Sequence, residues 1–347
     1  MKTICTIPGD GIGVEVIGAA RRVLEALRLE ARFVEAEAGW TTFFRTGNAL
    51  PETTLQAVCS ADATLFGAVS SPSERVAGYR SPIVGMRRAL NLSACVRPVQ
   101  SPPLPGARPN IDIVVVRENT EGLYSGLETR TGDEEATAQR VITRAASERI
   151  VRWALAYAQA NGRRRITVVH KANVLRETCG LFRETALRVL AEAAPIEVDE
   201  MLVDNAAYQL ARNPERFDVI VTTNLFGDIL SDVASVWGGG LGLAASANYG
   251  PHTAIFEPVH GSAPDIAGTG RANPLATFSA AALMLDYLGE STRASTLRAA
   301  INAVLRDGPH TPDLGGNATT AAVTDRCLAL INEYAGGDTV RAAMIGA

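Results

Sequence analysis

Apolar residues follow two different spacings along most of the chain. Short apolar runs, as at residues 4–7 and 63–69, have the length and composition of buried β-strands. Between such runs, apolar positions recur every three or four residues, as at residues 14–27, which is typical of an amphipathic helix. Because strands that alternate with helices build βαβ units, the pattern predicts an α/β fold with a mainly parallel sheet.

The same spacings predict further elements in the middle of the chain. Apolar residues at a 3.6-residue period indicate a helix across residues 150–158, and Asn161 with Gly162 forms a stop signal after it. Further strands are expected at residues 111–116, 166–169, 198–203 and 217–221.

Two clusters of glycine and proline interrupt the alternation, at residues 101–106 and 238–251. Such clusters mark connections between compact units, so we expect the chain to cross between two lobes near these points. The expected domains are residues 1–99 with 252–347, and residues 100–251. Between the clusters, residues 124–142 are polar, rich in Thr and Glu and poorly periodic, which indicates an exposed arm.

The composition is that of an ordinary globular chain. With 347 residues and 47% hydrophobic content, it can bury a substantial core. The formal net charge is −4 and the basic residues are scattered, which argues against binding to nucleic acid or to a membrane surface. Five cysteines lack C-x-x-C spacing, as expected for reduced thiols that serve as small core residues. No signal-peptide pattern precedes the first strand, so we expect a cytoplasmic protein.

Asp228 and Asp232 are the most informative pair in the chain. They are four residues apart, so on a helix they would lie on one face. Such a pair is more often a solvated helix face. Here it follows the apolar run 217–221, and ligands bind at the carboxyl ends of strands in open α/β sheets. The pair therefore indicates half of a divalent-metal site.

Asp204 offers a third carboxylate, because it directly follows the predicted strand 198–203. Three carboxylates form an all-oxygen set, which suits Mg²⁺ or Mn²⁺ and does not suit zinc. The four histidines are too dispersed in the sequence to indicate a zinc site.

Several basic and phenolic side chains are candidates for binding and catalysis. The planar guanidinium binds carboxylates bidentately, so Arg87, Arg97 and Arg117 together would suit a di- or tricarboxylate. Lys171 comes at the end of a predicted strand, where partial burial could lower its pKa enough for a general base. Tyr124 is a candidate general acid. Taken singly, most of these residues are more often structural or solvated. Arg117 is the exception, because it directly follows the apolar strand predicted at residues 111–116.

Two further segments suggest a nucleotide site. Residues 8–13 place three glycines between a strand and a helix, but Val14 breaks the G-x-G-x-x-G dinucleotide fingerprint. Residues 257–268 look like a loop rich in turn residues. An acidic side chain in such a loop can accept hydrogen bonds from both ribose hydroxyls while repelling a 2′-phosphate.

Together these residues resemble the β-decarboxylating dehydrogenase family, which contains isocitrate, isopropylmalate, homoisocitrate and tartrate dehydrogenases. The matching motifs are residues 7–13 (IPGDGIG), 224–232 (NLFGDILSD), 260–268 (HGSAPDIAG) and 311–316 (TPDLGG). The resemblance implies a two-lobed α/β/α sandwich with a mainly parallel mixed sheet, similar to isopropylmalate dehydrogenases and not of Rossmann type. It also implies a homodimer, or a tetramer of two dimers, with a dimer-forming arm and a shared active site.

The resemblance assigns roles to individual residues. Tyr124 would be the catalytic acid, and the partner subunit's Lys171 would be the general base. The cofactor would lie in the larger domain, and the substrate and metal in the smaller one. The substrate-binding residues would be Ser81, Arg87, Arg97, Arg117 and Asn173. The Mg²⁺ or Mn²⁺ ligands would be Asp228, Asp232 and the partner subunit's Asp204. The cofactor-binding residues would be Glu257, His260, Gly261, Ser262, Ala263, Asp265, Ile266 and Asn273.

Other motifs suggest the cofactor and the substrate. Asp265 and Ile266 match the NAD-preferring form of the cofactor loop. Residues 116–124 (VRENTEGLY) are similar to isocitrate and homoisocitrate members, and residues 81–88 (SPIVGMRR) are similar to homoisocitrate enzymes. We therefore expect NAD-dependent oxidative decarboxylation of homoisocitrate to 2-oxoadipate and CO₂. The alternatives are isocitrate, 3-isopropylmalate or an acid of the tartrate or malate type.

The chain departs from the family pattern at three positions. Relatives usually have an aromatic residue and Asn in place of Ser93 and Cys95, and some bacterial homoisocitrate enzymes have Arg in place of Val84. These positions lie where the family contacts the variable part of its substrate, so a modified substrate is an alternative. A regulatory subunit without catalysis would be expected to lack Lys171 or Tyr124, and a metal-dependent hydrolase or lyase would not need the ribose loop.

Overall fold

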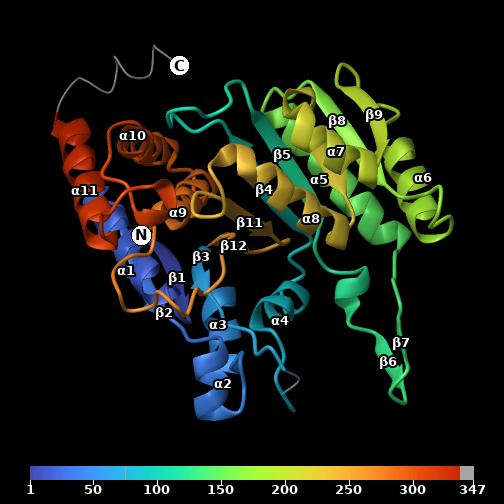
Figure 1. Cartoon of the computed structure of the whole chain (residues 1–347), viewed down its shortest axis with the longest axis horizontal. Coiled ribbons are helices and arrows are strands. Elements are labelled where there is room, and N and C mark those ends of the chain that lie inside the picture. Colours follow the sequence, from blue (N-terminus) through green and yellow to red (C-terminus); the bar gives the residue numbers. More distant parts are fainter. Residues whose placement is uncertain (75, 337–347) are drawn as a thin grey trace.

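A single mixed sheet forms the centre of the computed structural model, which describes residues 1–74 and 76–336. The strands follow the order β2-β1-β3-β12-β11-β4-β5-β10-β8-β9 (Figure 1). Their bounds are β1 Lys2–Gly9, β2 Ala31–Glu35, β3 Ala63–Ala68, β4 Ala94–Gln100, β5 Asp112–Glu118, β8 Arg165–His170, β9 Glu197–Leu202, β10 Val219–Thr222, β11 Ala245–Tyr249 and β12 Ala254–Pro258.

Most neighbouring strands in this sheet run parallel. The exceptions lie at the centre, where β11 is antiparallel to both β12 and β4, and β4 is antiparallel to β5. The predicted α/β class with a mainly parallel mixed sheet is therefore confirmed. The expected domain boundaries fall at the end of β4 and in the turn between β11 and β12, so both expected domains contribute strands to one sheet.

Helices cover both faces of the sheet. The α-helices are α1 Gly13–Ala26, α2 Trp40–Thr46, α3 Glu52–Ser60, α4 Pro82–Ala89, α5 Arg144–Ala160, α6 Thr178–Leu190, α7 Val203–Arg212, α8 Asn224–Ser235, α9 Leu275–Tyr287, α10 Ser291–Asp307 and α11 Thr320–Gly336. Figure 1 shows α1, α9, α10 and α11 grouped at one end of the sheet and α5 to α8 at the other. None of the helices in the described ranges has the length and hydropathy needed to cross a membrane.

The strand β5 shows how the layers are held together. Its Val114 and Val116 pack into a core with α5 and α6, whereas Ile113 and Val115 pack into a separate core with α7 and α8. Successive side chains of a strand point to opposite faces, so a continuous apolar run buries both. The helix predicted at 150–158 lies within α5.

The predicted arm at residues 124–142 contains structure that the sequence did not reveal. It forms a hairpin of β6 (Glu128–Thr131) and β7 (Glu135–Ala138), in which every residue is exposed. Gly132, with φ of 62°, lies in the connecting turn. Because neither face of the hairpin is buried in this chain, there is no alternation of apolar and polar residues to signal it. Cys59 also differs from expectation: it is exposed, whereas the other four cysteines are buried.

The helix α8 packs unusually close to β5. It starts directly after β10, which brings the first turns of α8 over Arg117 in β5. A methyl group at Gly227 would lie 2.6 Å from both Cβ and Cγ of Arg117. Only glycine at this position allows the helix backbone to approach the strand so closely.

The close approach predicts the effect of Gly227→Ala. The added methyl group must displace either the helix or the root of the Arg117 side chain, so we expect a loss of about 1–3 kcal/mol in the free energy of unfolding. The matched control is Gly18→Ala in α1, where nothing lies within 4 Å, and helix propensity should raise stability by about 0.5–1 kcal/mol. Urea unfolding measures both. Equal stabilities for the two variants would contradict the packing described.

Candidate active site

Three buried arginines come together from three elements. Arg117 lies in β5, Arg97 in the adjacent strand β4, and Arg87 in the last turn of α4. Their exposed fractions are 1%, 8% and 8%, respectively. Arg97 and Arg117 both form ion pairs with Asp228, and the charge of Arg87 acts on both Arg117 and Asp228. The structure thus gathers three positive charges in one small region.

Asp228 is the anion at the centre of this region. Its Oδ1 accepts a hydrogen bond from Arg117 and lies 3.3 Å from Nη2 of Arg97, while Oδ2 accepts the Tyr124 hydroxyl. Burial alone would raise the pKa of Asp228, but the charge of Arg117 and the hydrogen bond from Tyr124 lower it below its usual value. The carboxylate is therefore ionised at neutral pH.

Asp232 lies one turn further along α8, on the same helix face. Its Oδ1 is 3.2 Å from Nη1 of Arg97, which also donates to Oγ of Ser231 at 2.8 Å. Burial raises the pKa of Asp232, with the nearby charge of Asp228 adding to the shift and the charge of Arg97 opposing it. The predicted helix and the shared orientation of the two carboxylates are therefore found in the structure.

Asn224 completes the set of groups that hold Arg117, and the sequence pattern alone did not indicate this role. Its Oδ1 accepts from Nε and Nη2 of Arg117 at 2.9 and 2.7 Å, and its Nδ2 donates to the carbonyl of Glu121 at 3.0 Å. Its position in the sequence could have indicated this role, because it lies between a buried strand and the helix that carries Asp228. Arg117 is thus held by an amide and a carboxylate from the same helix.

Tyr124 reaches the site from a short 3₁₀ turn, η1 (Leu123–Ser125), after β5. The centre of its ring lies 5.0 Å from the guanidinium carbon of Arg117, within the range of a cation–π contact. Burial and the hydrogen bond to Asp228 raise the pKa of the Tyr124 hydroxyl. The hydroxyl therefore keeps its proton, which a general acid requires.

Lys171 and Asp204 lie apart from this cluster and pair with each other. Nζ of Lys171 is 2.5 Å from Oδ1 of Asp204, whose side chain is 63% exposed. Lys171 follows β8, and Asp204 lies in the first turn of α7. Within one chain, the predicted set of three carboxylates is therefore not assembled. Across the described ranges, no three His, Cys, Asp or Glu side chains gather closely enough to hold a metal ion.

Asp228 and Asp232 nevertheless fit part of a site for a hard divalent cation. Both offer carboxylate oxygens from one helix face, and the Asp232 side chain is 55% exposed. Mg²⁺ and Mn²⁺ take oxygen ligands and need more than two. The two residues would hold the cation only with oxygens from the substrate, water or another subunit.

The remaining predicted substrate residues lie at the rim. Ser81 directly precedes α4, the helix that carries Arg87. Asn173 is exposed, two residues beyond Lys171. Neither forms part of the arginine cluster in this chain.

The predicted cofactor segment packs against the glycine turn after β1. The carbonyl of Ser262 accepts from the backbone N–H of Ile12 at 2.9 Å, and the Ser262 hydroxyl bonds to that of Ser70 at 2.8 Å. A methyl group at Gly11 would lie 2.1 Å from the Ser262 carbonyl oxygen. The glycines at residues 8–13 therefore allow two loops to meet.

A cavity of about 410 Å³ opens beside these loops. Its walls include His260, Ile266 and Asn273, three of the predicted cofactor residues, together with Arg271 and Asp313. Burial lowers the pKa of His260, so its imidazole is neutral at pH 7. The predicted Gly261 and Asp265 are exposed, Ser262 is buried, and Ala263 is partly buried with φ of 38°.

Glu257 lies elsewhere than the sequence suggested. It was expected in a loop, but it belongs to β12 and is buried. Its Oε1 accepts from Nδ2 of Asn248 at 2.8 Å and lies 3.4 Å from Nη2 of Arg87. The expected loop at residues 257–268 starts too early, because Glu257 and Pro258 are the last two residues of β12. Glu257 therefore lies between the cofactor loop and the arginines.

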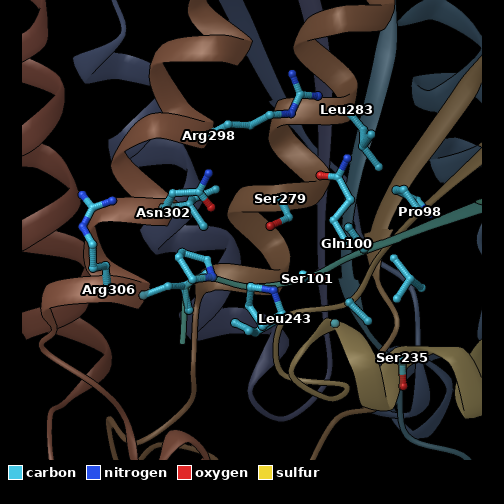
Figure 2. Close-up of a pocket in the computed structure, with 18 residues that line it drawn as sticks. Pro98, Gln100, Ser101, Ser235, Leu243, Ser279, Leu283, Arg298, Asn302 and Arg306 are labelled. Carbon is cyan, nitrogen blue, oxygen red and sulfur yellow. The ribbon is translucent and has the colours of Figure 1, made fainter. Parts of the chain in front are cut away.

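Another cavity, of about 360 Å³, contains none of the predicted residues (Figure 2). Gln100 at the end of β4 faces helices α9 and α10, which carry Ser279, Arg298 and Asn302. Arg298 is also paired with Asp286. Neither of the two cavities is lined by Tyr124, Lys171 or the three arginines. The size of a cavity is therefore no guide to the catalytic residues of this protein.

Comparison with known proteins gives a consistent result. The family model described as isocitrate/isopropylmalate dehydrogenase matches residues 3–327. An isocitrate/homoisocitrate dehydrogenase of Thermus thermophilus is 56% identical over 93% of this chain and 96% of its own length. A 3-isopropylmalate dehydrogenase of Methanothermobacter thermautotrophicus is 50% identical over 91% of this chain and 94% of its own.

Comparison with solved structures leads to the same family. The crystal structure of isocitrate dehydrogenase from Methylococcus capsulatus superimposes with a TM-score of 0.91 at 43% identity, covering 96% of this chain and all of that one. The names of these relatives differ in the substrate, but the proteins belong to one family. The chain is therefore a β-decarboxylating dehydrogenase of the isocitrate/isopropylmalate dehydrogenase family.

Proposed function

We propose that this enzyme catalyses the NAD-dependent and divalent-metal-dependent oxidative decarboxylation of homoisocitrate to 2-oxoadipate and CO₂. The main support is the set of three buried arginines around Asp228. In the described part of the chain, Nε of Arg87 and Nε of Arg97 are buried without a hydrogen-bond partner. Buried donors of this kind are costly unless a ligand accepts from them. A substrate with several carboxylates supplies those acceptors.

Homoisocitrate is favoured by residues 81–88, which are similar to homoisocitrate enzymes. The segment from Arg117 to Tyr124 has the form seen in isocitrate and homoisocitrate enzymes, so it argues against 3-isopropylmalate. The Thermus thermophilus relative carries both substrates in its name. Isocitrate and 3-isopropylmalate are the alternatives, because the names of similar proteins include both. Ser93, Cys95 and Val84 are the departures that bear on this choice.

In the proposed reaction, different residues bind the substrate, remove its proton and return a proton to the product. Arg87, Arg97 and Arg117 hold the substrate's carboxylates and orient its C2 and C3 atoms. When bound, the nicotinamide would accept the hydride from C2, and the cation would polarise the substrate's hydroxyl and carbonyl oxygens. The partner subunit's Lys171 takes the proton of the 2-hydroxyl as the hydride leaves. After CO₂ departs, Tyr124 donates its phenolic proton to C3.

In this proposal, a second copy of the chain brings its Lys171 and Asp204 to Asp228. Tyr208 on α7 and Ile229 on α8 are 53% and 52% exposed, and Val236, just beyond α8, is 66% exposed. Exposed apolar residues on adjacent helices are typical of an interface. The hairpin β6–β7 extends away from the body of the chain (Figure 1), and no other strand of the described residues pairs with its edges. A homodimer would cover both features.

The substrate assignment is tested with a panel of acids. Homoisocitrate, isocitrate, 3-isopropylmalate, tartrate and malate are each assayed with NAD⁺ or NADP⁺ and Mg²⁺, following absorbance of the reduced nucleotide. We expect the highest kcat/KM for homoisocitrate with NAD⁺, and loss of activity with EDTA. A higher value for another acid would replace homoisocitrate, and no reduction with any acid would refute the reaction type.

The role of Lys171 is tested by Lys171→Met, which keeps the aliphatic stem and removes the amine. We expect kcat to fall about 10²–10⁴-fold, since a general base contributes on that order, while substrate binding is little changed. The chain's other lysine offers the control Lys2→Met, which should keep wild-type kcat. Wild-type kcat in Lys171→Met would show that another group is the base.

The shared site is tested with a mixed dimer. Chains with Lys171→Met and chains with Asp232→Asn are co-expressed with different tags, and dimers carrying both tags are purified. Each parent dimer should be inactive, whereas the mixed dimer should have roughly half of wild-type activity, since one of its two sites is intact. An inactive mixed dimer would mean that Lys171 and Asp232 act from the same chain.

A further inference from the structure

Four buried polar side chains form a continuous chain across the centre of the sheet. Asn119 follows β5, Asn248 lies in β11, Glu257 in β12 and Arg87 in α4, and their exposed fractions range from 1% to 8%. Nδ2 of Asn119 donates to Oδ1 of Asn248 at 2.9 Å, and Nδ2 of Asn248 donates to Oε1 of Glu257 at 2.8 Å. Nη2 of Arg87 approaches the same Oε1 atom at 3.4 Å.

The two contacts of Glu257 differ in strength. A distance of 2.8 Å is that of a good hydrogen bond, whereas 3.4 Å is long for a guanidinium and a carboxylate, which usually meet at about 2.7–2.9 Å. Both charges are buried, so their attraction is little weakened by water. Something therefore restrains the Glu257 carboxylate from closing on Arg87.

Asn248 is well placed to be that restraint, because its own position is fixed on several sides. Its backbone pairs with Cys95 in β4 and with Ile255 in β12. Its Oδ1 accepts from Asn119, whose Nδ2 is also anchored to the carbonyl of Leu92 at 3.1 Å. With the oxygen committed to Asn119, the amide nitrogen must point toward Glu257.

We propose that Asn248 is a positioning residue that holds the Glu257 carboxylate away from Arg87 and so keeps the Arg87 guanidinium available for a substrate carboxylate. The inference rests on the proposed function, in which Arg87 binds the substrate. Without the amide of Asn248, Glu257 forms a full ion pair with Arg87 and competes with the substrate for it. The affinity for substrate then falls, while the chemical step is unaffected.

The first test is the kinetics of Asn248→Ala at saturating NAD⁺. We expect the substrate KM to rise about tenfold or more, since a hydrogen bond to a charged group is removed, and kcat to stay within about twofold of wild type. Asn248→Leu is the second variant, in case Asn248→Ala does not fold. It keeps the size of the side chain and cannot donate to Glu257, so the same rise in KM is expected.

The decisive test is rescue by Glu257→Gln. The neutral amide of the new side chain cannot form an ion pair with Arg87, so it no longer competes strongly with the substrate. The substrate KM of Asn248→Ala combined with Glu257→Gln should equal that of Glu257→Gln alone, within about twofold. If Asn248→Ala acted only by disturbing the packing, the substrate KM of the double variant would instead stay at or above that of Asn248→Ala.

Thr253→Val supplies the matched control. Thr253 is buried between β11 and β12, and its Oγ1 atom has no hydrogen-bond partner in the described part of the chain. Its kinetic constants should equal those of wild type. Unchanged substrate KM in both Asn248 variants, or no rescue by Glu257→Gln, would overturn the proposal. A wild-type enzyme inactive with every acid of the panel would instead refute the proposed function.

Discussion

The ion pair between Arg117 and Asp228 is the interaction on which the rest of the site depends. Arg117 is 1% exposed, and a guanidinium buried this deeply needs both a counter-charge and acceptors for its N–H groups. Asp228 provides the charge and Asn224 the acceptor oxygen, both from α8. Removing one partner of such a pair typically costs about 3–5 kcal/mol. This requirement fixes α8 on β5, and with it the positions of Asp232 and of the Tyr124 hydroxyl.

The site extends across the face of the sheet because the two halves of the sheet run in opposite directions. Strands β1, β2, β3 and β12 are parallel to one another, and so are β5, β10, β8 and β9. The antiparallel strands β11 and β4 join the halves. Residues directly opposite each other in such strands share a face, and Asn248, Cys95 and Arg117 form one row of this kind. This row of the site is therefore polar, buried and formed from three strands.

Much of this arrangement could be predicted from the sequence. Asp228 and Asp232 could be placed on one helix face because a four-residue spacing after a buried strand has a simple geometric meaning. The burial of Arg117 followed from its place at the end of an apolar run. The pairing of Lys171 with Asp204 could not be predicted. It requires β8 and β9 to be neighbours, and the order of the strands in the sheet is not given by the local sequence.

The burial and the hydrogen-bond partners of Asn248 and Glu257 could not be predicted from the sequence. Both are single polar residues within short strands, and nothing local distinguishes a buried polar side chain from an exposed one. Their partners are Asn119 and Arg87, which are far away in the sequence, so the polar chain exists only once β11, β12 and β5 are placed in one sheet. The hairpin β6–β7 was missed because no side of it packs on this chain.

The close contact at Gly227 has a consequence for how the molecule can move. Since the backbone of α8 rests on the first side-chain carbons of Arg117, helix and strand can be displaced only as one body. Asp228, Asp232 and Arg117 therefore keep the same mutual geometry, and little reorganisation energy is spent on them when a ligand arrives. Any adjustment to the size of a ligand must come from other elements around the site, such as α4, which carries Arg87.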